Sequence, residues 1–159
     1  MFAIRQAVSG DAASVATVML EATRTAMPYL PDLYTDEQVL EWITNSVLPQ
    51  AQVHVAELNG VLVGFLALRG DVLEHLYVQP GAQRQGVGSM LLEHAKALRA
   101  AGFTLWVFQR NTTARGFYER RGLKLVRLTD GSGNEEHEPD ALYEWHPSAG
   151  RTAPERVGR

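Results

Sequence analysis

The segment QRQGVG, residues 83–88, connects a strand-like run at 72–78 to a helix-like run at 89–101. The first N–H groups of a helix have no partner within the helix, and the helix dipole adds partial positive charge beside them. The two glycines of the segment carry no side chain, so an anion can approach the backbone closely, and its glutamine and arginine side chains supply further donors. The segment therefore predicts a site for a phosphorylated ligand.

Outward from this segment, the residue pattern predicts strands alternating with helices. Strands are expected at 2–7, 52–58, 61–69, 72–78, 104–108, 123–128 and 141–145. Helices are expected at 12–26, 36–47, 89–101 and 111–121. Asn59-Gly60 predicts a tight hairpin, and Pro49 should end the second helix. The fold class is therefore α/β, with hairpins and crossovers in one sheet.

The composition limits the kind of protein this can be. The chain has 159 residues, a net charge of −3 and no cysteine. We expect one domain at 1–146 and a tail at 147–159 that is rich in Pro, Gly, Ser and Arg. The negative charge argues against a nucleic-acid binder, and the lack of cysteine excludes disulfides and thiolate chemistry. No apolar run approaches the roughly 20 residues of a membrane span, so we expect a cytoplasmic protein without membrane contact.

Three motifs in order along the chain carry a family resemblance. They are LYVQP at 76–80, the Gln-x-x-Gly-x-Gly turn that starts at Gln83, and the pattern Asn111-x-x-Ala114-x-x-Phe117-Tyr118-x-x-x-Gly122. Together they resemble the GNAT family of acetyl-CoA-dependent N-acetyltransferases. The resemblance implies a single-domain fold with about four helices around a mixed sheet of six or seven strands, in which strands four and five splay apart. It also implies acetyl transfer to a primary amine by direct attack in a ternary complex, and a homodimer is common in the family.

The resemblance also implies a donor site. The pyrophosphate of acetyl-CoA would lie on the turn and the helix start, and the pantetheine would run along the fourth strand. The residues implied in this binding are Leu76, Val78, Gln83, Arg84, Gln85, Gly86, Val87, Gly88, Ser89, Asn111, Ala114 and Tyr118. The N–H of Val78 would face the thioester carbonyl, where negative charge develops. Asn111 could instead serve only as a helix N-cap.

Two residues are expected to carry the proton transfers, and no metal is expected. The resemblance implies that Tyr118 is the acid that protonates the leaving thiolate, a role open to a phenol because it stays protonated at neutral pH. Strict alternation along 72–78 places Glu74 on the face of Leu76 and Val78, and His75 on the opposite face with Leu73 and Tyr77. Glu74 is the preferred base, with His75 and a water chain as alternatives.

The acceptor is less well specified. The segment 130–140 carries five carboxylates and no Lys or Arg, which favours a cationic amine, although a solvated mobile loop fits the composition equally well. A metal site from Glu136, His137 and Asp140 is a weaker alternative. The resemblance implies that the apolar segment 27–34 covers the acceptor pocket, and a small molecule is favoured as the acceptor.

Several remaining residues are expected to be structural, and two other functions stay open. Phe117, Trp42 and Trp106 should lie in the core, and the histidines at 54, 94 and 146 should play no part in catalysis. A catalytically silent acyl-CoA sensor is the main alternative to the enzyme. A nucleotide-binding Rossmann fragment is disfavoured, because Leu91 stands where the third glycine of that fingerprint belongs.

Overall fold

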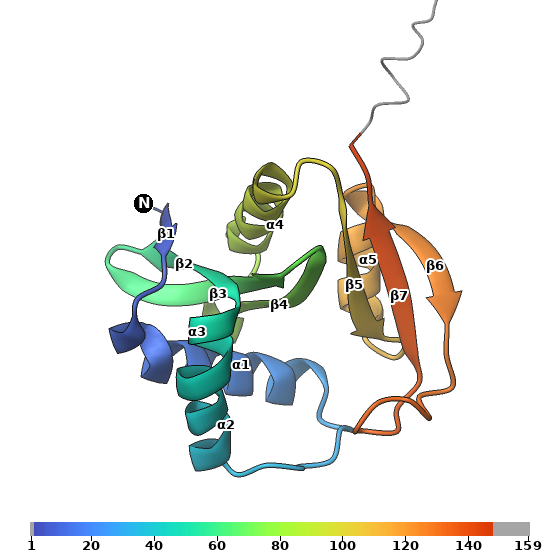
Figure 1. Ribbon diagram of the computed structural model, residues 1–159, viewed down its shortest axis with the longest axis horizontal. Coiled ribbons are helices and arrows are strands. Elements are labelled where there is room, and N and C mark those ends of the chain that lie inside the picture. The colour runs from blue at the N-terminus through green and yellow to red at the C-terminus, as the bar shows by residue number, and fades with distance from the viewer. Residues whose placement is uncertain (1, 148–159) are drawn as a thin grey trace, which may run out of the picture.

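The computed structural model describes residues 2–147, which form one seven-stranded sheet with helices on both faces (Figure 1). The sheet order is β1-β2-β3-β4-β5-β7-β6. The strands are β1 (Phe2–Gln6), β2 (Gln52–Leu58), β3 (Val61–Arg69), β4 (Val72–Val78), β5 (Phe103–Phe108), β6 (Lys124–Leu128) and β7 (Asp140–Trp145). The helices are α1 (Ala12–Ala26), α2 (Asp36–Trp42), α3 (Leu48–Gln50), α4 (Val87–Leu98) and α5 (Thr112–Arg120). The predicted fold class is confirmed, whereas most of the predicted tail lies outside the described residues.

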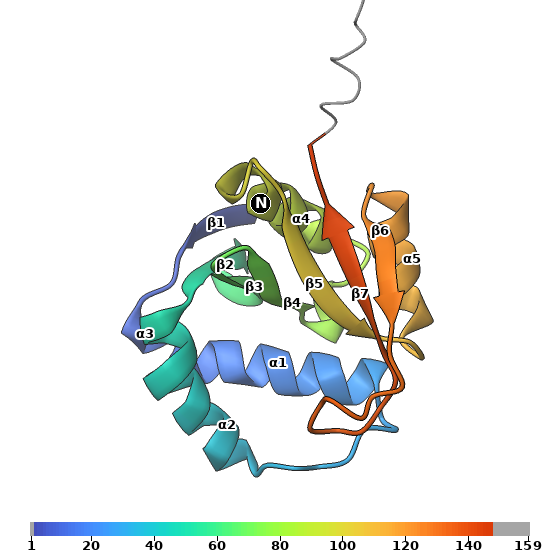
Figure 2. The same cartoon turned by 45° about the vertical axis from the view of Figure 1, so that its right-hand side comes forward.

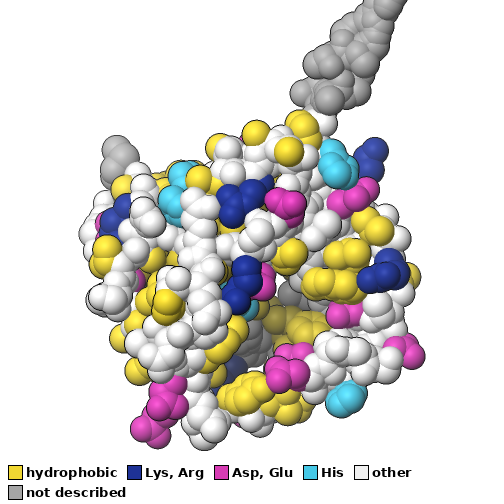
Figure 3. All heavy atoms as spheres, viewed as in Figure 1, with side chains coloured by type: hydrophobic (Ala, Val, Ile, Leu, Met, Phe, Trp, Pro, Cys, Tyr) yellow, Lys and Arg dark blue, Asp and Glu magenta, His cyan; other side chains and the backbone are white. Residues whose placement is uncertain are grey.

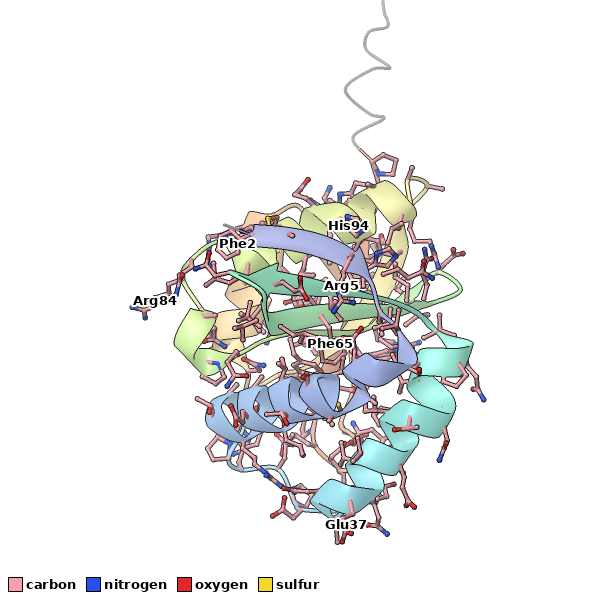
Figure 4. All side chains as sticks on the ribbon, turned by 90° about the vertical axis from the view of Figure 1, so that its left-hand side faces the viewer. Phe2, Arg5, Glu37, Phe65, Arg84 and His94 are labelled. Atoms are coloured by element: carbon pink, nitrogen blue, oxygen red, sulfur yellow. The ribbon has the colours of Figure 1, made fainter. Side chains whose placement is uncertain are left out.

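Helices lie on both faces of the sheet (Figure 2), and an apolar core lies between the helices and the sheet on each face. One joins α4 and α5 to the inner side chains of β3, β4, β5 and β7. The other joins α1 and the segment Ile43–Val47 to β2 and β3, and Phe65 lies there between the sheet and α1 (Figure 4). On this face of the sheet, the helices α1 and α2 therefore cover the half that is formed by the N-terminal strands and leave β5, β6 and β7 uncovered.

The predicted divergence of β4 and β5 is present. The two strands run parallel and are bridged at a single pair, Val72 opposite Thr104, in the part of the chain that the structure describes. All other pairings in the sheet are antiparallel. The strands β4 and β5 meet at their N-terminal ends and diverge toward their C-terminal ends, so an opening forms beside Val78.

The second helical region extends further than predicted. Ile43–Val47 forms a π-helix, in which the Leu48 N–H donates to the Ile43 carbonyl, and the chain stays helical to Gln50. Pro49 therefore does not end the helix near residue 47. The wider π-helical turn accommodates Pro49, which has no N–H and would otherwise interrupt the hydrogen bonds of a regular α-helix.

The predicted alternation along β4 is broken by a bulge. Ala67 lies opposite His75 and Leu68 lies opposite Leu73, so Glu74 is an extra residue without a partner on β3. Leu73 consequently packs in the same core as Leu76 and Val78, not on the face of His75 as alternation predicted. No helix of the described chain is long and apolar enough to cross a membrane.

Candidate active site

A cleft of about 760 Å³ opens where β4 and β5 part, and Figure 3 shows the molecule hollowed between its two halves. Residues of α1, β4, β5, α5, the turn before α4 and the first turn of α4 line it, together with Asp140. Since α1 covers one face of the sheet and α4 and α5 the other, a cleft lined by all three reaches both faces. Two molecules can therefore meet in it from opposite sides.

The backbone of Val78 is directed into this cleft. The Gln79 N–H donates to the Val63 carbonyl at 2.7 Å, and the next pair along, Val78 and Gly64, lies directly opposite. Hydrogen-bonded and non-bonded pairs alternate in an antiparallel ladder, so Val78 points its N–H and carbonyl away from β3. The carbonyl accepts from Gln83 Nε2 at 3.2 Å. The N–H of Val78, like that of Leu76 two residues earlier, faces the space that β5 has left.

The start of α4 offers a set of unpaired N–H groups. Gly86 is the N-cap in a left-handed conformation, with φ of 86°, and no side chain caps the helix. The N–H groups of Val87, Gly88 and Ser89 therefore have no intrahelical partner, which suits an anion. The Gln83 N–H is instead used by a turn, because it donates to the Pro80 carbonyl at 3.4 Å.

Positive charge gathers beside this helix start. Arg120 and Arg121 of the α5 terminus line the cleft, and Arg121 Nε donates to Ser89 Oγ at 2.9 Å. The Arg121 guanidinium also lies 3.9 Å from the ring centroid of Phe117. Arg84 has a left-handed backbone with φ of 69° and points outward at the edge of the molecule (Figure 4). Gln85 donates to the Gly81 carbonyl and does not line the cleft.

Helix α5 presents Asn111, Ala114 and Tyr118 to the cleft. The Asn111 side chain caps the helix, since its Oδ1 accepts from the Ala114 N–H at 3.2 Å. The Asn111 side chain thus caps the helix and also lines the cleft wall. A capping role and contact with a bound ligand, the two alternatives for Asn111 in the sequence, are therefore compatible. Phe117 packs edge-on against Tyr118 with ring centroids 5.3 Å apart, and it lines the cleft as well as the core.

Tyr118 is a buried phenol at the cleft wall. Burial raises the pKa of Tyr118 well above its ordinary value, and the nearby Tyr77 adds to this effect. Burial also raises the pKa of Tyr77 to about 12, with a smaller contribution from the Glu136 carboxylate. Both phenols therefore stay protonated throughout the neutral range and can donate a hydrogen bond into the cleft.

The two candidate bases on β4 differ in access. Glu74 lies at the bulge and lines the cleft, and its Oε1 lies 3.2 Å from Arg69 Nε. His75 does not line the cleft and packs edge-on against Trp42 with ring centroids 5.3 Å apart. Burial, with help from the Arg69 charge, lowers the pKa of His75 to about 4. The geometry thus favours Glu74 over His75 as a group that meets a bound molecule.

The acidic segment before β7 makes side-chain contacts with other parts of the chain. Tyr34 Oη donates to Glu135 Oε2 at 2.5 Å. Arg110 donates to both carboxylate oxygens of Glu138, at 2.8 and 2.9 Å, and its guanidinium lies 3.8 Å from the ring centroid of Tyr29. The segments after α1 and before β7 therefore lie side by side (Figures 1 and 2). Among residues 2–147, no three His, Asp or Glu side chains gather as a metal site.

Some cleft residues were not predicted from the sequence. Tyr77 lines the cleft, and so does Trp106, whose side chain was expected in the core but is 45% exposed. Met27 and Asp140 also line it, and they come from the segments 27–34 and 130–140 that were expected to bear on the acceptor. Trp42 is also 41% exposed, against expectation. The alternation of the LYVQP motif could have drawn attention to Tyr77, whereas nothing in the sequence tells that the face beneath Trp106 lacks a helix.

Comparison with known proteins agrees with this fold and cleft. Residues 49–124 match a family model described as an acetyltransferase (GNAT) domain. The peptidyl-lysine N-acetyltransferase YjaB of Salmonella typhimurium is 32% identical over 127 residues, which cover 79% of this chain and 86% of the relative. The peptidyl-lysine N-acetyltransferase YiaC of Escherichia coli is 29% identical, over 77% of this chain and 84% of the relative.

Solved structures share the fold. The apo form of YjaB from Escherichia coli superposes with a TM-score of 0.77 at 24% identity, covering 92% of this chain and 99% of that one. The PaiA N-acetyltransferase of Thermoplasma acidophilum, solved with coenzyme A, gives a TM-score of 0.70 at 19% identity over 92% and 99% of the two chains.

A sheet split between its fourth and fifth strands, with a glycine turn at the start of α4, defines a GNAT-type acetyltransferase fold. The chain belongs to the GNAT acetyltransferase family and is an N-acetyltransferase.

Proposed function

We propose that this protein transfers an acetyl group from acetyl-CoA to the ε-amine of a lysine in a polypeptide. The observation that carries the proposal is the divergence of β4 from β5, which opens a cleft lined by both Val78 and Tyr118. The names of the relatives YjaB and YiaC favour a peptidyl lysine over the small-molecule amine that the sequence suggested.

The described residues fit the donor. A Cβ placed on Gly88 would lie 3.4 Å from the Phe117 ring and 3.8 Å from Val78 Cγ2, so the missing side chain leaves room in the cleft. The unpaired N–H groups at the start of α4 and the charge of Arg120 and Arg121 suit a pyrophosphate. Acetyl-CoA would supply the thioester whose acetyl group is transferred.

The chain's own groups would then act in sequence. The Val78 N–H donates to the acetyl carbonyl oxygen and stabilises the negative charge that develops there as the amine attacks. Glu74 accepts the proton that the acceptor ammonium must lose, directly or through water. Tyr118 donates its proton to the sulfur as the carbon–sulfur bond breaks. The amine, the acetyl carbon and the sulfur all belong to one ternary complex, so no acyl-enzyme is needed.

The test is release of free thiol from acetyl-CoA in the presence of a lysine-containing peptide. Acetyl-CoA binding is measured in parallel by calorimetry, so that occupancy is known. Release that depends on protein and on peptide supports the proposal. Tight binding of acetyl-CoA without release from any peptide or small amine would instead identify the silent acyl-CoA sensor.

A further inference from the structure

Among residues 2–147, no helix covers one face of the sheet half formed by β5, β6 and β7. The core under α1 and α2 is built on β2 and β3, with Tyr77 at its margin, and includes no residue of β5, β6 or β7 in the described chain. The buried side chains of β5 and β7 all belong to the other core, under α4 and α5. Figure 1 shows α5 behind these strands and no helix in front of them. The bare face is thus on the α1 side of the sheet.

The centre of this face is an exposed aromatic group. Trp106 of β5 lies opposite Leu142 of β7, and Leu142 lies opposite Arg127 of β6. The Trp106 side chain is 45% exposed, and the Arg127 guanidinium lies 5.5 Å from its ring centroid. We call these three residues the open face. A half-exposed indole on a sheet face without a covering helix favours a contact surface, because tryptophan, with an apolar ring and a polar N–H, is enriched at interfaces.

The open face is continuous with the cleft. Trp106 belongs to both, and its neighbours Phe108 and Asp140 line the cleft beside it. Asp140 is fixed in position, because its carboxylate accepts hydrogen bonds from the Thr129 hydroxyl and from Asn134 Nδ2. A molecule that rests on the open face can therefore extend a side chain directly into the cleft from the α1 side.

The charge at the open face differs between its two strands. Between residues 129 and 145, which include β7, the chain carries six acidic side chains and no Lys or Arg, whereas β6 carries Arg127 opposite Leu142 and Lys124 opposite Glu144. Asp140 and Glu144 lie on the same side of β7 as Leu142, because side chains alternate along a strand. A segment that carries a lysine is attracted to this edge, whereas an acidic segment is repelled.

We propose that the open face is the docking surface for the polypeptide on either side of the acceptor lysine, with Trp106 as its anchor. This inference rests on the proposed function and adds how the protein distinguishes a lysine within a polypeptide from a free amine. A lysine side chain is long enough for its backbone to stay on the sheet surface while its amine enters the cleft. A small amine has no backbone to place there and gains nothing from Trp106.

The test compares two acceptors with acetyl-CoA at saturation. One is a ten-residue peptide with a single central lysine, and the other is Nα-acetyl-lysine N-methylamide, which has the same amine without flanking residues. We expect the wild-type protein to prefer the peptide in kcat/KM, and Trp106→Ala to lower the peptide-to-amide ratio about tenfold. Trp42→Ala is the matched control, since Trp42 is equally exposed but does not line the cleft, and it should leave the ratio unchanged.

A second measurement does not depend on how Trp106→Ala folds. In wild-type protein labelled with 5-fluorotryptophan, the peptide should shift the fluorine resonance of Trp106, assigned with Trp106→Phe, and not that of Trp42. An unshifted Trp106 resonance at saturating peptide overturns the proposal, and so does an equal loss for both acceptors in Trp106→Ala.

The remaining outcomes are also decisive. Transfer to the amide with no preference for the peptide overturns docking on the open face but leaves the proposed function standing. No transfer to either acceptor, at full acetyl-CoA occupancy, contradicts the proposed function itself. Sedimentation that shows a wild-type dimer, dissociated by Trp106→Ala, would assign the face to a second copy of the chain and overturn the proposal.

Discussion

Val72 and Thr104 form the single bridge between β4 and β5 within residues 2–147, at the end of β4 that is far from Val78. The sheet is thus continuous at one end and open at the other. An N–H at the open end, on Val78, is freed from the sheet without being buried against another strand. A donor held in this way needs no rearrangement when charge develops on a bound carbonyl oxygen.

Removing the hydroxyl of Tyr118 should separate catalysis from binding. We expect Tyr118→Phe to lower kcat by about 100-fold, the usual scale for loss of a general acid, while the Kd for acetyl-CoA stays within a factor of two or so. Because burial raises the pKa of Tyr118, the wild-type protein should not lose activity through this phenol as pH rises from 7 to 9. Stopped-flow thiol release and calorimetry measure the two quantities.

Tyr143→Phe provides the comparison for Tyr118. It also removes one buried hydroxyl, which contacts Arg115 and Glu119 but lies outside the cleft. Its kcat should therefore stay near that of the wild-type protein even if its stability falls. Equal losses of kcat in both variants would mean that the effect of Tyr118→Phe is structural.

Neutralising Glu74 tests the base. We expect Glu74→Gln to lower kcat/KM about 100-fold near pH 7, because no carboxylate remains to accept the ammonium proton. Glu57→Gln is the control, since Glu57 is also paired to an arginine, Arg5, at 3.0 Å but is remote from the cleft. A full rate in Glu74→Gln would move the proton transfer to water or to another side chain.

Much of the fold follows from the sequence, and the exceptions have physical reasons. Strand and helix positions depend on local periodicity and on turn residues such as Asn59-Gly60, so they were predicted to within a few residues. The bulge at Glu74 depends on how β3 and β4 pair, which alternation along one strand cannot reveal. Trp106 was expected in the core because its strand is almost wholly apolar, but α1 and α2 do not extend over β5.

The candidate site likewise contains residues that the sequence could predict and residues that it could not. The residues around the start of α4 and along α5 could be named in advance, because they follow one another in short motifs. Tyr77, Asp140 and the contact between Tyr34 and Glu135 join parts of the chain that are far apart in sequence. Only the assembled sheet brings these side chains together at the acceptor side.

His75 should make the stability depend on pH. Its pKa is lowered to about 4 in the folded protein, against an ordinary value of 6.5, so the unfolded chain binds more protons between these values. The free energy of unfolding therefore falls as pH decreases from 6.5 to 4, by roughly 3 kcal/mol at most from this residue. We expect His75→Leu to remove that part of the loss, as measured by urea unfolding at pH 7 and pH 4.5.

The replacement at residue 75 should not itself be costly at neutral pH. Within residues 2–147 the His75 Nδ1 is buried without a hydrogen-bond partner, so an apolar side chain there gives up no bond at that atom. His146→Gln is the control, because the side chain of His146 is 65% exposed. The same pH dependence in wild type and His75→Leu would show that other groups govern the acid transition.

Filling the space at Gly88 should block the donor without unfolding the protein. A Cβ there meets only ordinary contacts, at 3.4 Å from Phe117 and 3.8 Å from Val78, so Gly88→Ala should fold normally. The longer side chain of Gly88→Leu extends into the cleft, and we expect it to raise the Kd for acetyl-CoA at least about tenfold in calorimetry, a loss of about 1.4 kcal/mol. Gly81→Leu is the matched control, because a Cβ on Gly81 meets nothing within 4 Å and Gly81 does not line the cleft. Unchanged acetyl-CoA affinity in a folded Gly88→Leu protein would remove the start of α4 from the donor site.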